Sequence, residues 1–205
     1  MKFTACVPLL FLLAPGAPPR AESASDQLAY FDKTTLSGYL QARVSVYGAP
    51  DAKGRYPAPK VYPANVLFER PDRFRIVLNP GEKNEYRAVA EGGIVRWVDF
   101  STGLSGKDAV ADLVDPLAVG LLDSTGELSR FGAAGDLPLG KDAPISAVRT
   151  IPAAWGTSVA KTLVFFGAKG EPVAFDFSMH DGSRLFFSVT YFRQNPETSP
   201  KDFEL

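Results

Sequence analysis

The organisation of the fold is clearest in residues 61–100, which read VYPANVLFERPDRFRIVLNPGEKNEYRAVAEGGIVRWVDF. It contains four short apolar segments: Val61–Glu69, Phe74–Leu78, Tyr86–Ala90 and Ile94–Phe100. Turn residues, such as the Gly92-Gly93 pair, separate the segments and are typical of hairpins. Strands this short and this close in sequence predict an antiparallel meander.

Strand-like segments also lie on both sides of this meander. Upstream, Tyr39–Tyr47 alternates apolar residues with polar or aromatic ones, which predicts a half-buried strand. The Gly-rich and Pro-rich segment 48–59 then predicts a long exposed loop. Downstream, further strands are expected at Ile145–Thr150, Thr162–Phe166, Val173–Ser178 and Arg184–Phe192, with a last short strand starting at Phe203.

Helical patterns are confined to two places. Asp26–Thr34 has the spacing of a short amphipathic helix. Asp108–Leu122 carries apolar residues at helical spacing, and Pro116 divides it into two short helices. The pattern therefore predicts an α+β domain, with a large twisted antiparallel sheet and helices inserted in mid-chain.

The N-terminus has the layout of a secretory signal peptide. Lys2 precedes a short apolar run, followed by small residues and prolines, and Ala21-Glu22-Ser23 fits a cleavage site. Residues 1–23 are therefore expected to be the signal peptide and residues 24–205 a single exported domain. Cys6, the only cysteine, would leave with the signal peptide, so no disulfide is expected. This apolar run is too short to span a bilayer, and no second run in the sequence is long enough to do so.

Composition disfavours most catalytic and nucleic-acid-binding classes. The 205 residues carry a net charge of −1, which offers no basic surface for nucleic acid. One His and one Cys make a His-based or Cys-based metal site hard to build, and no cofactor is expected. Gly135–Lys141 matches part of a phosphate-binding loop, but Asp142 stands where Ser or Thr is needed. His180 flanks the Asp181-Gly182 turn signal, and Ser105 lacks nucleophile-elbow spacing, so no enzyme is predicted.

Several strand segments are apolar on both faces. Examples are Val66-Leu67-Phe68, Leu163–Phe166 and Leu185-Phe186-Phe187. Such strands need a cover on each face, or one face lines a cavity. Both a packed two-layer core and an open barrel that holds an apolar ligand remain consistent with this pattern.

The segment Phe68-Glu69-Arg70-Pro71-Asp72-Arg73-Phe74-Arg75 resembles the LolA-like superfamily of periplasmic lipoprotein carriers. Tyr86–Asp99 is similar to the Trp-bearing strand region of that family, and Asp115–Leu122 to its Pro-led inserted helix. The resemblance implies an incomplete, strongly curved antiparallel β-barrel, a half-barrel with a short N-terminal helix and inserted helices as a lid. It also implies that Arg70 holds the lid by hydrogen bonds, although a surface ion pair at the strand end is an alternative.

These features together predict a periplasmic, non-enzymatic binding protein that holds lipid or lipoprotein acyl chains in an apolar cavity. The expected cavity residues are Phe68, Ile76, Trp97 and Phe187. Sequence leaves the facing open by one residue, which would flip every side chain. The first alternative is an envelope sensor or interaction domain that binds a partner polypeptide, and the second is a small hydrolase using Asp or Ser groups.

Overall fold

The computed structural model describes residues 30–31, 33–92, 94–109, 145–150, 159–167 and 170–205. Its strands form one ten-stranded sheet in the order β6-β5-β4-β3-β2-β1-β10-β9-β8-β7, and every neighbouring pair is antiparallel. The bounds are β1 Ser37–Tyr47, β2 Lys60–Glu69, β3 Arg73–Leu78, β4 Tyr86–Glu91, β5 Ile94–Asp99, β6 Leu104–Ala109, β7 Ile145–Thr150, β8 Val159–Phe166, β9 Pro172–Met179 and β10 Arg184–Gln194.

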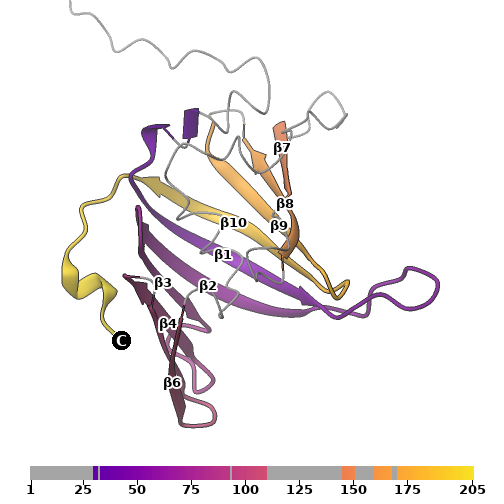
Figure 1. The fold of residues 1–205 in the computed structure, drawn as a ribbon, viewed down its shortest axis with the longest axis horizontal. Coiled ribbons are helices and arrows are strands. Elements are labelled where there is room, and N and C mark those ends of the chain that lie inside the picture. Colours follow the sequence, from indigo (N-terminus) through magenta and orange to yellow (C-terminus); the bar gives the residue numbers. More distant parts are fainter. Residues whose placement is uncertain (1–29, 32, 93, 110–144, 151–158, 168–169) are drawn as a thin grey trace, which may run out of the picture.

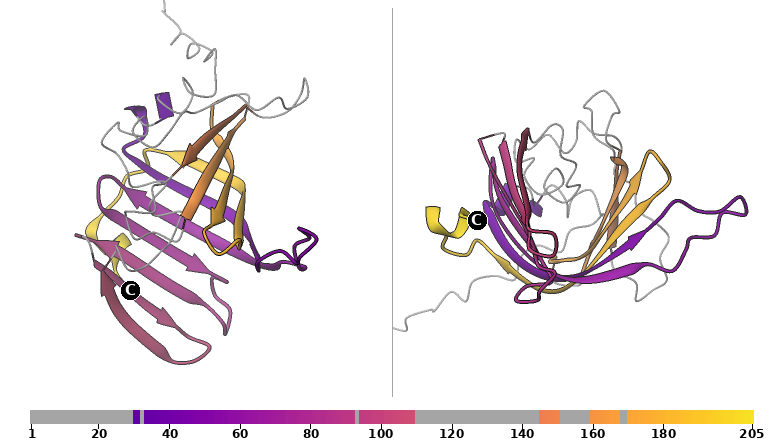
Figure 2. Two further views of the ribbon diagram at one scale, coloured as in Figure 1. Left: turned by 45° about the vertical axis from the view of Figure 1, so that its right-hand side comes forward. Right: turned by 90° about the horizontal axis from the view of Figure 1, so that it is seen from below.

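The sheet curls into an open trough (Figure 2), with β6 and β7 as the last strands at its two edges. The pairing of β1 with β10 shifts register between Gln41 and Ala42, and such bulges bend a strand and increase its twist. The long β1–β2 connection projects beyond one end of the trough (Figure 1). The predicted curved half-barrel is therefore confirmed, whereas the predicted helical lid falls mainly on residues 110–122, outside the described residues.

The start of the predicted inserted helix is wrong, because Leu104–Ala109 forms strand β6. Its residues have low intrinsic strand preference, so local sequence does not favour this conformation. Pairing with β5 provides it, and Gly106 lies opposite Trp97. A Cβ atom at Gly106 would lie 2.6 Å from Cε2 of Trp97, so the indole ring requires glycine there.

The two chain ends of the described domain are anchored by short helical turns. Residues 30, 31, 33 and 34 are helical, which agrees with the end of the predicted Asp26–Thr34 helix. The predicted strand at Phe203 is wrong, because Pro200–Phe203 forms a 3₁₀ helix, η3. The Asp202 carboxylate accepts hydrogen bonds from the backbone N–H and the hydroxyl of Ser199, at 2.7 and 2.8 Å, which favours the turn over an extended strand.

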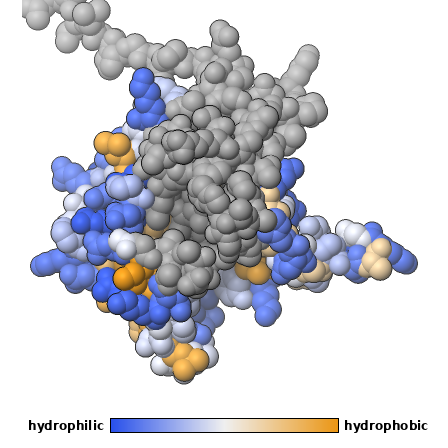
Figure 3. Space-filling view, viewed as in Figure 1, coloured by the Kyte–Doolittle hydropathy of each residue, from blue (hydrophilic) through white to orange (hydrophobic). Residues whose placement is uncertain are grey.

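The described residues that are visible in Figure 3 are mainly hydrophilic, with small separate hydrophobic patches among them. Among the described residues, no helix is long and apolar enough to cross a membrane.

Candidate functional site

The concave face of the trough carries alternate residues of most of the strands, and nearly all of them are apolar. They form one connected buried cluster with Phe31. The opposite, convex face is identified by η3, which packs against β3 and β4 from outside the trough (Figure 2). The clustered strand residues are Leu40, Ala42, Val44, Ala64, Val66, Phe68, Phe74, Ile76, Ala88, Ala90, Val95, Val164, Phe166, Phe175, Phe177 and Phe187.

All four residues predicted to line a cavity lie on this concave face. Phe68, Ile76 and Phe187 belong to the buried cluster, and Trp97 packs against it. Ile76 pairs with Ala88, which pairs with Trp97, so their side chains share one face across three strands. Register thus resolves the one-residue ambiguity of the sequence, while the binding role of these residues stays a prediction.

Small residues lie between the large ones along the middle of the concave face. Ala42 pairs with Ala64, and Ala88 lies between Ile76 and Trp97. The Phe68 ring lies over Gly38, where any Cβ atom would collide with it. All three of these alanines are buried, at between 2% and 6% exposed.

The wall formed by β8, β9 and β10 is aromatic. The rings of Phe175 and Phe177 stack at 6.3 Å, and Phe187 meets Phe177 edge to face at 5.6 Å. At the end of the trough near the N-terminal helix, Phe31 lies 5.9 Å from both Phe166 and Phe192. Stacked and edge-to-face arrangements such as those of Phe175, Phe177 and Phe187 are favoured by ring quadrupoles, so these rings stabilise the wall.

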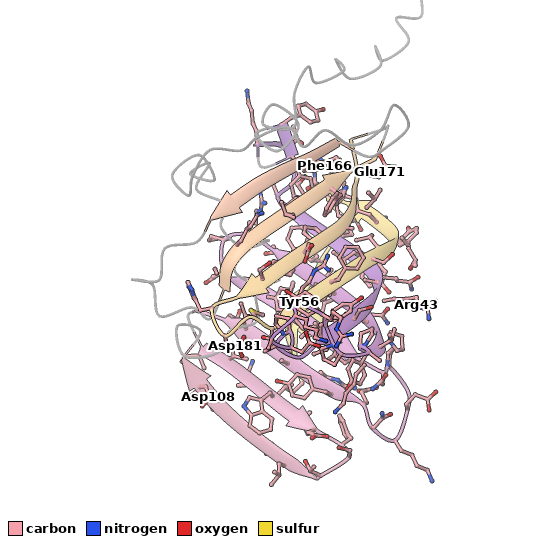
Figure 4. The ribbon with its side chains drawn as sticks, turned by 90° about the vertical axis from the view of Figure 1, so that its right-hand side faces the viewer. Arg43, Tyr56, Asp108, Phe166, Glu171 and Asp181 are labelled. Atoms are coloured by element: carbon pink, nitrogen blue, oxygen red, sulfur yellow. The ribbon has the colours of Figure 1, made fainter. Side chains whose placement is uncertain are left out.

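Trp97 gives the β5–β6 side of the face an amphipathic rim. Its indole N–H donates a 2.8 Å hydrogen bond to the Asp108 carboxylate on β6 (Figure 4), and its ring stacks on Tyr86 at 6.3 Å. The ring therefore has an apolar side toward the cluster and a polar edge toward exposed Asp108.

Arg70 lies at the end of the face where β2 finishes. Its guanidinium carbon is 5.5 Å from the centroid of the Phe31 ring and 6.0 Å from that of Phe68, and the residue is only 9% exposed. Arg70 is therefore a buried residue beside two aromatic rings, and the alternative of an ion pair at the strand end stays a prediction. Its backbone N–H donates to the carbonyl of Leu36 at 2.8 Å. The predicted hydrogen bonding to a lid stays a prediction.

The other buried polar residues lie away from the centre of the concave face. Thr35, Ser37, Asn79 and Glu85 are at strand ends or in the β3–β4 turn, and Asp176 points to the convex face. Asp176 accepts two 2.6 Å hydrogen bonds from Arg184, and these bonds raise the pKa of the Arg184 guanidinium. Sequence reasoning missed this pair, although a spacing of eight residues across the Asp181-Gly182 hairpin signal could have suggested it.

The described residues form no metal centre. In this part of the chain no three His, Cys, Asp or Glu side chains are grouped to hold a metal ion. His180 and Asp181 flank the β9–β10 turn, where the Asp181 carboxylate accepts hydrogen bonds from Ser183 at 2.6 and 2.8 Å. The concave face therefore offers apolar side chains for contact with another apolar group.

This combination defines a class of protein: an open antiparallel half-barrel with a continuous apolar inner face. No protein-family model matches the sequence, and no curated protein matches it either. Solved structures similar to the chain include a LolA superfamily protein from Nitrosomonas europaea, with 12% identity and a TM-score of 0.46 over 90% of this chain and 99% of that one. A DUF1329 family protein from Desulfovibrio piger has the same identity and TM-score over 90% and 98%.

The lipoprotein LppX of Mycobacterium tuberculosis is also similar, with 12% identity and a TM-score of 0.44 over 85% of this chain and 95% of that one. The predicted resemblance to LolA-like proteins is thus confirmed in that LolA superfamily structures are among those found.

Proposed function

We propose that the protein is a periplasmic carrier or binding protein that holds the acyl chains of a lipid or lipoprotein against its concave face. The observation that carries this proposal is the single apolar cluster that runs across the sheet, with small residues at its centre. A ligand that matches such a face is long, flexible and apolar, and an acyl chain has these properties.

Burial alone is sufficient for affinity in such a site. Each CH₂ group transferred from water to an apolar surface contributes about 0.8 kcal/mol, so ten of them contribute about 8 kcal/mol before ordering costs. No catalytic group is needed. Phe68, Ile76, Trp97 and Phe187 are proposed to line the path of the chain, because they lie on the face at positions spread over β2, β3, β5 and β10.

Arg70 is proposed to close one end of this path. Its stacking against Phe31 and Phe68 fixes the guanidinium beside the apolar cluster, where a hydrogen-bond acceptor from a covering segment could reach it. Arg70→Lys keeps the charge but loses the planar stacking, so it should increase the rate of ligand release while the fold is preserved.

The decisive experiment compares an enlarged central residue with an enlarged peripheral one. Ala88→Phe places a ring between Ile76 and Trp97, so it should abolish the binding of an environment-sensitive apolar dye, and fatty acid should displace the dye from the wild type. Ser188→Phe, on the exposed convex side of β10, is the control and should leave binding unchanged. If the face were a solid core, Ala88→Phe would cost about 1–3 kcal/mol of stability and wild type would bind no dye.

The second candidate is a domain that binds a partner polypeptide. Among the described residues, β6 is an edge strand, and the hairpin that joins it to β5 exposes Phe100 and Leu104, at 51% and 62%. Such an edge can accept an extended segment by strand addition. Native mass spectrometry of protein purified from the envelope separates the candidates, because a co-purified lipid supports the carrier and a bound polypeptide supports the interaction domain.

Export is part of the proposal, with residues 1–23 as the cleaved signal peptide and residues 24–205 as the mature domain. The layout of the N-terminal residues supports it. Sequencing the N-terminus of protein recovered from the periplasm should give a start near Ala24, and an intact Met1 in cytoplasmic protein would contradict it.

A further inference from the structure

The convex face carries a pocket that has no part in the proposed acyl-chain site. Its volume is about 420 Å³, within the range of small-molecule sites. Its floor is formed by outward-facing residues of four adjacent strands, β10, β1, β2 and β3, and one wall is the C-terminal segment that follows β10. Because successive residues of a strand face opposite sides, none of its floor residues belongs to the concave cluster.

The strand register places four residues of the pocket floor side by side in one row, with an arginine at each end. Arg193 pairs with Tyr39, which pairs with Leu67, which pairs with Arg75. At about 4.8 Å between strands, this row spans about 14 Å. A second row places Asn65 beside Val77, and Tyr191 lies two residues from Arg193. The centre of the floor is therefore apolar and aromatic, with the Tyr39 and Tyr191 rings 6.2 Å apart.

The C-terminal wall is held in place at both ends. Near β10, the Asn195 side-chain oxygen accepts hydrogen bonds from the N–H groups of Leu36 and Ser37, at 2.8 and 3.1 Å. At the far end Phe203 is 2% exposed, and Arg75 donates to the Asp202 carbonyl at 3.1 Å. The pocket is thus formed before any ligand arrives, which lowers the ordering cost of binding.

The two cations of the pocket are not equivalent. Arg75 is engaged by the Asp202 carbonyl, although its Nε–H is buried without a hydrogen-bond partner. The side chain of Arg193 is exposed, and its guanidinium forms no ion pair or hydrogen bond with any residue that the structure describes. Two acidic residues also line the pocket. The Asp202 carboxylate already accepts hydrogen bonds from the backbone N–H and the hydroxyl of Ser199. The Glu197 carboxylate is exposed, and its negative charge would repel a bound anion.

We propose that this pocket binds a small organic anion with a flat apolar body, such as an aromatic carboxylate. The carboxylate lies at Arg193, which can donate two parallel hydrogen bonds. The apolar body lies on the rings of Tyr39 and Tyr191 and reaches Leu67. The site is independent of the proposed acyl-chain function, because it uses the opposite face of the same strands.

The test is an NMR titration of the full mature chain with 2-naphthoate, with the uncharged 2-naphthalenemethanol as the matched probe. We expect naphthoate to shift the backbone amides around Tyr39, Leu67 and Tyr191, and the alcohol to bind at least tenfold more weakly. Arg193→Gln should raise the Kd for naphthoate about tenfold. Glu197→Gln should lower it severalfold, because a like charge is removed.

Arg43→Gln is the control for general loss of positive charge, because Arg43 is an exposed convex-face residue of β1 outside the pocket (Figure 4). It should leave the Kd unchanged. The proposal is overturned if naphthoate shifts only amides of the concave-face residues, if Arg193→Gln and Arg43→Gln have the same effect, or if Glu197→Gln weakens binding. An acyl chain bound at the concave face would respond to none of these three substitutions.

Discussion

The two faces of the sheet are formed by the same strands but differ in the side chains that they bury. The concave face is a single apolar cluster, with aromatic rings along β9 and β10 and alanines near its centre. The convex face is polar, and it buries a few groups locally, at the Asp176–Arg184 pair and beneath η3. Continuous apolar cover suits a ligand of varying length, whereas local charged and aromatic contacts fix a particular geometry.

The largest effect should come from the concave face. Phe177 is fully buried between Phe175 and Phe187, so Phe177→Ala should lower the free energy of unfolding by about 3–5 kcal/mol. Chemical denaturation of the protein measures this loss. Phe100→Ala, at a ring that is 51% exposed, is the control and should cost less than about 1 kcal/mol. Equal losses of stability for Phe177→Ala and Phe100→Ala would mean that the aromatic cluster of the concave face does not contribute more to stability than an exposed ring.

On the convex face, Phe203→Ala should come next. The ring is 2% exposed and lies 5.9 Å from the Arg73 guanidinium carbon, so its removal should cost about 2–3 kcal/mol. The loss is smaller than for Phe177 because a terminal segment can relax without disturbing the sheet. Hydrogen exchange should show faster exchange at residues after Asn195. Leu205→Ala, at a side chain that is 44% exposed, should change neither measurement.

A smaller effect is expected from the Asp176–Arg184 pair. Asp176→Asn leaves the Arg184 guanidinium without its bidentate partner, and the side chain of Arg184 is 32% exposed, so water compensates in part. The expected cost is about 1–2 kcal/mol, between that of exposed and buried pairs. A double-mutant cycle that combines Asp176→Asn with Arg184→Gln should give a coupling free energy that stabilises the folded state. A coupling near zero would mean that the pair does not stabilise the convex face.

The smallest effect concerns pH and the β3–β4 turn. The pKa of the Glu85 carboxyl lies below its ordinary value of 4.5, because the Gly81 N–H and then the Arg87 guanidinium donate to the carboxylate. A lowered folded-state pKa contributes stability above pH 4.5 that is lost as the pH falls through the lowered value. Glu85→Gln should therefore flatten the acid limb of a stability–pH curve. Glu82→Gln, in the same turn, is the matched control, because it makes the same substitution without removing the hydrogen bonds from Gly81 and Arg87 to Glu85.

Much of the strand pattern could be predicted from local sequence. Segments such as Ile145–Thr150 were expected with the observed bounds, because apolar alternation and flanking turn residues are local signals. Leu104–Ala109 could not be found this way, since Ser105, Gly106 and Asp108 have no preference for strand. Its strand depends on β5 and on the Trp97 ring above Gly106.

For the candidate site, the residue types were predictable but their facing was not. Phe68, Ile76, Trp97 and Phe187 were recognisable as apolar strand residues, whereas the shared face follows from the register of strands far apart in sequence. The convex pocket had no sequence signal at all. Arg193 and Arg75 are separated by more than a hundred residues, and only the pairing of four strands places them in one row.

Local sequence was enough to predict most of the strands, the turns between them and the surplus of apolar side chains, because these depend on neighbours within a few residues. Tertiary structure decided which face the apolar residues share, where the edge strands lie and which charged groups meet. Those outcomes depend on strand order and register, and a shift of a single residue would have exchanged the two faces.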